Sequence, residues 1–411
     1  MTTRRLSRAE IVLVGTELVC GQRTDKNGPF LAMELSRAGF EPARITMLPD
    51  WRTSVAAEIA EAMDRGPALV CVCGGLGPTS DDVTREAVAE ALGVGILIDG
   101  AARAQVRGRA ARFGDVIDEA IDRQAMVFPG ARWYPNGIGV APGLSIRRGG
   151  TTLFLLPGPP DEMQAMFRNA VLPEIAGTGQ VRFSRILRTA GLREVAVAEM
   201  AETVMSNWQA LSVAYLPAPG LVDVVLSSDD GPKLDAAASA VRAALASGVY
   251  AEDDRSLEEV VGALLAQRFE RVVTAESCTG GLVAELLTSV PGSSRYFPGG
   301  VVAYSNELKQ SLLGVSRELL DRHGAVSGEA ATAMAEGARS RLGAEWAISV
   351  TGIAGPDGGT ADKPVGLVFH GLAGPAGVEF SRHTLGGDRT AVRTASARLA
   401  LDLLRRRLTL S

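Results

Sequence analysis

Short apolar runs alternate along the first part of the chain with segments in which apolar residues recur every three or four positions. Continuous apolar runs are typical of strands buried on both faces, and the second spacing is typical of amphipathic helices. In chain order these segments are 11–14, 27–38, 44–48, 55–63, 68–73 and 85–92. The alternation predicts an α/β fold with a parallel sheet covered by helices and ligands at the carboxyl ends of its strands.

The pattern changes after Gly177-Thr178-Gly179. Here two strands and two helices are expected in the order strand, helix, strand, helix, and the first strand has one polar face. This order predicts a small α+β unit. The expected strands are 181–188 and 221–227, and the expected helices are 194–205 and 233–245. A Pro-Ala-Pro-Gly turn at 217–220 precedes the second strand.

The last part returns to α/β alternation. Ser256 is expected to cap a helix at 257–267. The further segments are strands at 271–274, 300–304, 347–350 and 366–370, and helices at 282–287, from 306 and at 390–406. We therefore predict three domains: residues 1–173, 174–251 and 252–411.

Composition narrows the class of protein. Of 411 residues, 46% are hydrophobic and 22% are charged. The net charge is −5, and the sequence has no long run of basic or acidic residues. Nucleic-acid binding and membrane insertion are therefore not expected. The four cysteines form neither a metal knuckle nor a disulfide framework, and Cys71 and Cys73 are expected to be buried on one strand face. A cytoplasmic protein is predicted.

Ser277 is the candidate nucleophile. It lies between the strand ending near Thr274 and the helix beginning at Leu282, and Gly280 and Gly281 follow it. The first amide hydrogens of a helix have no partner within the helix, so a hydroxyl at this turn suits a nucleophile beside an oxyanion hole. The alternative is an ordinary serine N-cap.

Histidine is scarce, which restricts the available bases. His323 is expected in a loop, and His370 and His383 lie in or beside strand-like runs; none is expected to be catalytic. Lys309 falls in the first turn of a predicted helix, where a positive charge is disfavoured. If partly buried it would serve as a base, whereas a solvated surface lysine is the alternative.

Two loops of the first domain carry a second set of polar residues. The turn Gly74–Thr79 offers backbone donors suited to phosphate, and Asp81 and Asp82 follow it. A carboxylate beside a phosphate implies a divalent cation such as Mg²⁺. The alternative is that the aspartates only cap a helix. Further polar candidates on the first loop are Thr16, Glu17, Asp25 and Asn27.

The strings at 15–22, 74–84 and 156–163 resemble the N-terminal domain of the CinA family (competence/damage-inducible protein A), which is similar to molybdopterin-binding folds. The resemblance implies metal-dependent hydrolysis of ADP-ribose in some members. It would make Asp82 the metal ligand and Thr16, Gly75, Gly77 and Thr79 the phosphate-binding residues. Lys26 departs from the family's usual Asp-Thr-Asn string. In this family the middle segment resembles a KH domain, but residues 191–194 lack the second glycine of a Gly-X-X-Gly loop.

The stretches at 275–281, 299–309, 351–359 and 386–389 together resemble the CinA C-terminal domain, a nicotinamide-nucleotide amidohydrolase. The implied reaction converts nicotinamide mononucleotide and water to nicotinate mononucleotide and ammonia, without a cofactor. The implied catalytic residues are Ser277, Lys309, Tyr304 and Thr351, and Cys278 is the rival nucleophile. The expected substrate-binding residues are Thr279, Gly280, Gly281, Asn306, Gly355 and Arg389. A homodimer is expected, and a non-enzymatic competence scaffold is the alternative function.

Overall fold

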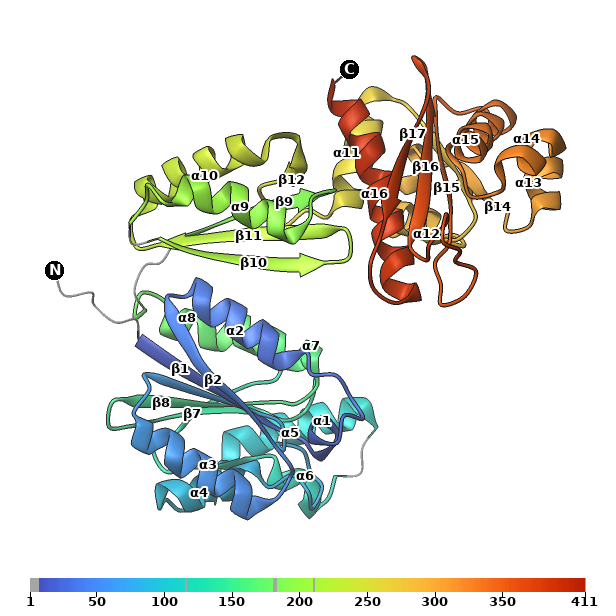
Figure 1. Ribbon diagram of the computed structural model, residues 1–411. Coiled ribbons are helices and arrows are strands. Elements are labelled where there is room, and N and C mark those ends of the chain that lie inside the picture. Colours follow the sequence, from blue (N-terminus) through green and yellow to red (C-terminus); the bar gives the residue numbers. More distant parts are fainter. Residues whose placement is uncertain (1–6, 115–116, 180–182, 210, 411) are drawn as a thin grey trace. The chain divides into compact units, whose positions relative to one another are not determined.

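The computed structural model describes residues 7–114, 117–179, 183–209 and 211–410 (Figure 1). The chain divides into two compact units, Met1–Phe183 and Ser184–Ser411. The predicted start of the strand at 181–182 lies outside the described residues.

The first unit contains a six-stranded sheet in the order β2-β1-β3-β8-β7-β6. The prediction of a parallel sheet is right for the first four strands and wrong for the last two, because β7 and β6 run antiparallel to their neighbours. The strand bounds are β1 Ser7–Val14, β2 Phe40–Leu48, β3 Leu69–Cys73, β6 Arg132–Tyr134, β7 Gly143–Arg148 and β8 Thr151–Leu156.

Helices cover both faces of this sheet. Apolar residues of α3 and α4 pack on one face, and those of α2 and α7 pack on the other (Figure 1). The helices are α1 Thr16–Val19, α2 Asn27–Arg37, α3 Arg52–Arg65, α4 Thr84–Leu92, α5 Gly100–Phe113, α6 Glu119–Arg123, α7 Pro160–Met166, the π-helix η1 Phe167–Val171 and α8 Leu172–Ile175. A separate two-stranded sheet joins β4 Leu97–Ile98 and β5 Met126–Val127.

The second unit begins with the expected α+β segment, a sheet in the order β10-β11-β9-β12 with two helices. Its elements are β9 Phe183–Ala190, α9 Glu194–Met205, β10 Ser212–Ala218, β11 Leu221–Ser228, α10 Gly231–Leu245, η2 Ala246–Gly248 and β12 Val249–Ala251. A Cβ on Gly191 would lie 2.8 Å from an Asp402 carboxylate oxygen. The loop at which KH domains clamp nucleic acid is therefore packed against the last helix of the chain.

The remainder of this unit has a second sheet, in the order β14-β13-β15-β16-β17. Its first three strands are parallel and its last two antiparallel. The strands are β13 Val272–Glu276, β14 Gly299–Val302, β15 Trp346–Gly352, β16 Leu367–Gly374 and β17 Gly377–Thr384. The helices are α11 Leu257–Arg268, α12 Leu282–Thr288, η3 Ser293–Arg295, α13 Asn306–Leu313, α14 Arg317–His323, α15 Gly328–Leu342 and α16 Arg389–Leu410.

Helices again cover both faces of the sheet. Apolar residues of α11, α12 and α16 form one core, and those of α13, α14 and α15 form the other. The first core also contains Ala190 and Tyr250 from the α+β segment. Ion pairs extend this contact, since Asp402 binds Arg405 and Arg406, whose guanidinium groups donate to the Ser247 and Ala190 carbonyls. The predicted boundary at residue 251 thus lies within one compact unit.

His323 lies on a helix and His370 lies in the core of the second unit, outside the loops predicted to carry the site. His323 ends α14 instead of lying in a loop, so that prediction was wrong. His370 is fully buried on β16, with its Nε2 atom 2.9 Å from the Ser396 hydroxyl. Burial, together with the neighbouring His383, lowers the pKa of His370 to about 3.

The low pKa of His370 predicts a pH-dependent stability. Between pH 6.5 and 3 the unfolded chain protonates this imidazole and the folded chain does not, so the free energy of unfolding should fall by about 1.4 kcal/mol per pH unit as pH decreases. Urea unfolding at pH 7.0 and 5.5 measures the effect. His370→Gln should reduce the slope, and His323→Gln is the control. Equal slopes for both variants would contradict the assignment.

Candidate functional site

Three loops meet at the carboxyl ends of parallel strands in the second unit. Ser277 directly follows β13, Tyr304 follows β14, and Thr351 lies at the end of β15. The Ser277 amide donates to the Val350 carbonyl at 2.9 Å, and the Ala303 amide donates to the Glu276 carbonyl at 2.8 Å. The three loops predicted to carry the site therefore lie side by side.

Lys309 and Ser277 are in direct contact. The Lys309 amine lies 3.1 Å from the Ser277 hydroxyl, 3.0 Å from the Ala303 carbonyl and 3.2 Å from the Tyr304 carbonyl. Its side chain is almost fully buried, with a relative exposure of 1%. Ser305 caps the helix that carries it. The alternative of a solvated surface lysine is excluded.

The surroundings of Lys309 make its charged form less stable than that of a solvated lysine. Burial lowers the pKa of this amine. A neutral amine has two hydrogens and one lone pair. As an ammonium ion, Lys309 donates its three hydrogens to the Ser277 hydroxyl and the two carbonyls. As a neutral amine it would donate to the two carbonyls, and its lone pair would accept a hydrogen bond from the Ser277 hydroxyl. This geometry is compatible with a base beside a nucleophile.

Cys278, the rival nucleophile, lies in a less reactive setting. Its side chain is buried and its thiol is free of disulfide bonding. Burial raises the pKa of this thiol to about 11. Because the thiolate is the reactive form, this position disfavours nucleophilic attack by Cys278.

A buried glutamate side chain, next to Ser277 in the sequence, lies at the start of α12. The buried Glu276 carboxylate accepts the amide hydrogens of Gly281, Val283 and Ala284 at 2.9, 3.1 and 2.9 Å. The Gly280 amide donates to the Ser277 carbonyl. The expectation that the Gly280 and Gly281 amides are free donors was therefore wrong. Sequence reasoning missed Glu276, although an acidic residue just before a helix start is a recognised signal.

Besides Cys278, whose amide hydrogen has no acceptor in the part of the chain that the structure describes, Thr279 is a remaining candidate donor on the turn. Among the described residues we find no acceptor for its amide hydrogen, and its buried Oγ1 atom also lacks a partner. Its carbonyl accepts a hydrogen bond from Arg393 at 2.7 Å. Arg393 was also missed, although it lies one helical turn after Arg389 on α16.

Arg389 joins two of the other expected residues. Its guanidinium donates to the Gly355 carbonyl at 2.7 Å and to the Tyr304 hydroxyl at 3.2 Å. Arg389 and Tyr304 are both exposed, so they remain accessible to a ligand. Asn306 is exposed at the start of α13. Thr351, in contrast, is buried and its hydroxyl donates to the Ala325 carbonyl at 2.6 Å.

Four of the predicted site residues of the first unit lie around one cavity of about 1210 Å³. Gly75, Gly77, Thr79 and Asp82 all line this cavity. Thr16 does not line it, and instead exchanges hydrogen bonds with Asp50. Three of the four residues predicted to bind phosphate therefore lie at one cavity, and Thr16 does not.

Contacts within the glycine-rich turn limit what it can bind. The Asp82 carboxylate accepts hydrogen bonds from the Thr79 amide at 2.9 Å and the Thr79 hydroxyl at 2.6 Å, which occupies two expected phosphate donors. The described residues contain no group of three or more His, Cys, Asp or Glu side chains that could hold a metal ion. These residues fit at most a metal ion that is also coordinated by a phosphate ligand.

A buried cation lies beneath the same turn. Arg85 is 2% exposed and donates to the Leu76 carbonyl at 2.9 Å and the Gln124 carbonyl at 3.1 Å. Burial lowers the pKa of its guanidinium to about 10. Sequence reasoning missed Arg85, because its place on α4 resembles that of any surface arginine. Its positive charge favours an anionic ligand at the turn.

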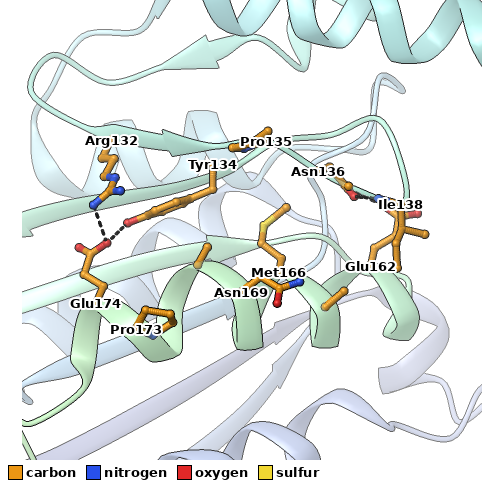
Figure 2. Close-up of a pocket in the computed structure, with 13 residues that line it drawn as sticks. Arg132, Tyr134, Pro135, Asn136, Ile138, Glu162, Met166, Asn169, Pro173 and Glu174 are labelled. Atoms are coloured by element: carbon orange, nitrogen blue, oxygen red, sulfur yellow. Dashed lines mark hydrogen bonds and ion pairs between the residues drawn. The ribbon is translucent and has the colours of Figure 1, made fainter.

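A second cavity of the first unit, about 740 Å³, contains none of the predicted residues. Figure 2 shows several of its polar groups bonded to one another. Glu174 binds both Arg132 and Tyr134, and Asn136 donates to Glu162 at 2.7 Å. Because these groups are already paired, the cavity is a weaker candidate than the glycine-rich turn.

The fold and the loops define an α/β protein with a molybdopterin-binding-like first unit. The family profile described as probable molybdopterin binding domain matches residues 10–177, and that of the CinA C-terminal domain matches residues 254–408. The CinA-like protein of Solibacter usitatus is 39% identical over 409 residues, which cover 98% of both chains. The CinA-like protein of Frankia casuarinae is 41% identical over 418 residues, 98% of this chain and 96% of that one. The chain belongs to the CinA family.

Solved structures also match part of the chain. The competence/damage-inducible protein CihA from Agrobacterium tumefaciens is 42% identical and covers 38% of this chain and 97% of its own, with a TM-score of 0.35. A CinA superfamily protein from Klebsiella pneumoniae is 34% identical and covers 38% of this chain and 100% of its own, with a TM-score of 0.37. Within the described residues, every helix is too short or too polar to cross a bilayer.

The contrast between the cysteines can be measured directly. Cys20 is exposed, whereas Cys71, Cys73 and Cys278 are buried. A thiol reagent such as dithionitrobenzoate at pH 8 should therefore react quickly with one thiol per native chain and with four in denaturant. Cys20→Ser should abolish the fast phase. A fast phase that persists in this variant and disappears in Cys278→Ala would restore Cys278 as a nucleophile.

Proposed function

We propose that the second unit is an amidohydrolase that converts nicotinamide mononucleotide and water to nicotinate mononucleotide and ammonia. The observation that carries this proposal is the contact between the Ser277 hydroxyl and the buried Lys309 amine. Hydrolysis of a carboxamide requires a nucleophile, a proton acceptor and donors for the oxyanion. Family membership supports the choice of substrate.

The first half of the reaction forms an ester on Ser277. Its Oγ atom adds to the carboxamide carbon while its proton passes to the neutral Lys309 amine. The tetrahedral oxyanion accepts a hydrogen bond from the Thr279 amide. The carbon–nitrogen bond then breaks, and the Lys309 ammonium donates its proton to the departing nitrogen, which leaves as ammonia.

The second half restores the enzyme. Water adds to the ester carbon while Lys309 accepts its proton. The bond between that carbon and the Ser277 oxygen breaks, and Lys309 returns the proton to this oxygen. The product is the carboxylic acid nucleotide, which loses its proton to solvent and leaves as the carboxylate. Arg389 and Tyr304, both exposed beside the Gly355 loop, are suited to the phosphate and the pyridine ring of the substrate.

Removal of either member of the pair should abolish turnover. Ser277→Ala and Lys309→Met should each lower the rate of ammonia release from nicotinamide mononucleotide by at least about 1000-fold, because each removes an essential step. Coupled glutamate dehydrogenase measures the ammonia. Circular dichroism should show that both variants fold.

The matched control is Lys363→Met, since Lys363 is a partly buried lysine whose amine donates to two backbone carbonyls. It should retain turnover. Unchanged ammonia release by folded Ser277→Ala would refute the mechanism. A wild-type protein that releases no ammonia would favour the competence scaffold as the alternative function.

A second candidate activity, metal-dependent hydrolysis of ADP-ribose by the first unit, is favoured by one observation. The cavity at the glycine-rich turn is lined by Gly75, Gly77 and Asp82 and lies above the buried Arg85 guanidinium. Asp82 would share a divalent cation with the pyrophosphate of the ligand, and the ion would neutralise phosphate charge. The homodimer and the cytoplasmic location stay predictions.

The two activities can be separated by substitution. Asp82→Ala should lower Mg²⁺-dependent release of AMP from ADP-ribose by about 100-fold and leave ammonia release unchanged, because the two sets of residues belong to different units. Chromatography of the nucleotides measures the products. The control is Glu86→Ala, which removes a nearby carboxylate paired with Arg123. Equal AMP release by wild type and Asp82→Ala would exclude Asp82 as the metal ligand.

A further inference from the structure

The turn that carries Ser277 is held at two points by side chains outside the catalytic pair. Glu276 lies before the turn, and Arg393 reaches it from α16. We propose that Glu276 and Arg393 are positioning residues that fix the Ser277 hydroxyl against Lys309 and leave the Thr279 amide as the oxyanion donor. This inference rests on the amidohydrolase function proposed above.

Glu276 has an unusually complete set of partners. Its Oε2 atom accepts from Gly281 and Val283, and its Oε1 atom accepts from Ala284. The side chain is 1% exposed. A carboxylate at the positive end of a helix is favoured electrostatically. Here it also occupies the amides that a substrate oxyanion would otherwise reach.

The backbone of the turn makes this arrangement possible. Gly280 and Gly281 have φ angles of +61° and +96°, which a residue with a Cβ adopts only with strain. The chain therefore bends back at these positions, so the α12 amides face the carboxylate of the strand residue Glu276. At the start of the same turn, the Ser277 hydroxyl lies 3.1 Å from the Lys309 amine.

Arg393 restrains the opposite side of the turn. Its guanidinium donates to the Thr279 carbonyl at 2.7 Å, and it lies one helical turn beyond Arg389. Donation to this carbonyl fixes the orientation of the peptide that follows Thr279. Two arginines of one helix thus hold the Ser277 turn through Arg393 and the Gly355 loop through Arg389.

The test uses the full-length protein with Glu276→Gln and Arg393→Gln. A glutamine has one acceptor oxygen, so its amide nitrogen would face at least one backbone N–H group in place of an acceptor. We expect kcat for ammonia release to fall about 100-fold for Glu276→Gln and about tenfold for Arg393→Gln, with KM within threefold of wild type, because small displacements of reacting groups reduce the rate strongly.

Matched controls separate positioning from stability. Glu285→Gln removes an exposed carboxylate from the first turn of the same helix, and Arg398→Gln removes an arginine of α16 that donates to the Pro219 carbonyl at 2.9 Å. Both should retain wild-type kcat. Turnover is expressed per folded molecule, measured by circular dichroism. A kcat for Glu276→Gln equal to that of its control would overturn the inference, even if the variant melts at a lower temperature.

A second measurement does not depend on the substrate. The rate at which a fluorophosphonate modifies Ser277, determined by mass spectrometry, should fall in parallel with kcat for both variants. If wild type is modified but releases no ammonia, the proposed substrate fails and the positioning role is judged on modification alone. If wild type is neither modified nor active, both proposals are overturned.

Discussion

The buried amine of Lys309 is the group on which the site depends. An ammonium ion loses its hydration in the protein interior, and this cost lowers its pKa unless a carboxylate compensates. Here the nearest partners are two carbonyls and a hydroxyl. The two carbonyls come from the segment after β14, and the hydroxyl follows β13. The pairing of these strands therefore determines whether the amine can act as a base.

The Glu276 carboxylate balances the partial positive charge at the start of α12 without any ligand. Helix α12 begins with unpaired amide hydrogens, and Glu276 accepts three of them. A free helix start would attract any anion nonspecifically. Because the protein's own carboxylate occupies this position, the donors that remain for an oxyanion are few and close to Ser277.

Much of the fold could be predicted from periodicity, because apolar spacing directly reflects burial. Helix α9 was predicted to the residue, and the Ser256 cap of α11 was confirmed. The antiparallel strands β7 and β8 were missed, although Gly149 and Gly150 between them are a hairpin signal.

The site was predictable where backbone order alone determines position. Parallel strands bring Ser277, Tyr304 and Thr351 to one edge, so their neighbourhood followed from the alternation of elements. The alternation of elements did not predict the burial of Lys309 or the direction of the Glu276 side chain, because both depend on tertiary packing. For the same reason, the sequence did not reveal that the Asp82 carboxylate binds Thr79.

The glycine-rich turns at 74–79 and 277–281 support functional arguments of different strength. A Cβ on Gly74 would lie 2.2 Å from the Val14 carbonyl, and one on Gly75 would lie 2.3 Å from the Thr84 hydroxyl oxygen. These glycines also have φ angles of +105° and +64°, so close packing and backbone conformation both require them, whether or not a phosphate binds. At Gly280 and Gly281, a Cβ would meet nothing closer than 3.5 Å, and it is the positive φ angles that require glycine. That bend turns the amides at the start of α12 toward the buried Glu276 carboxylate, next to Ser277, which packing by itself does not demand.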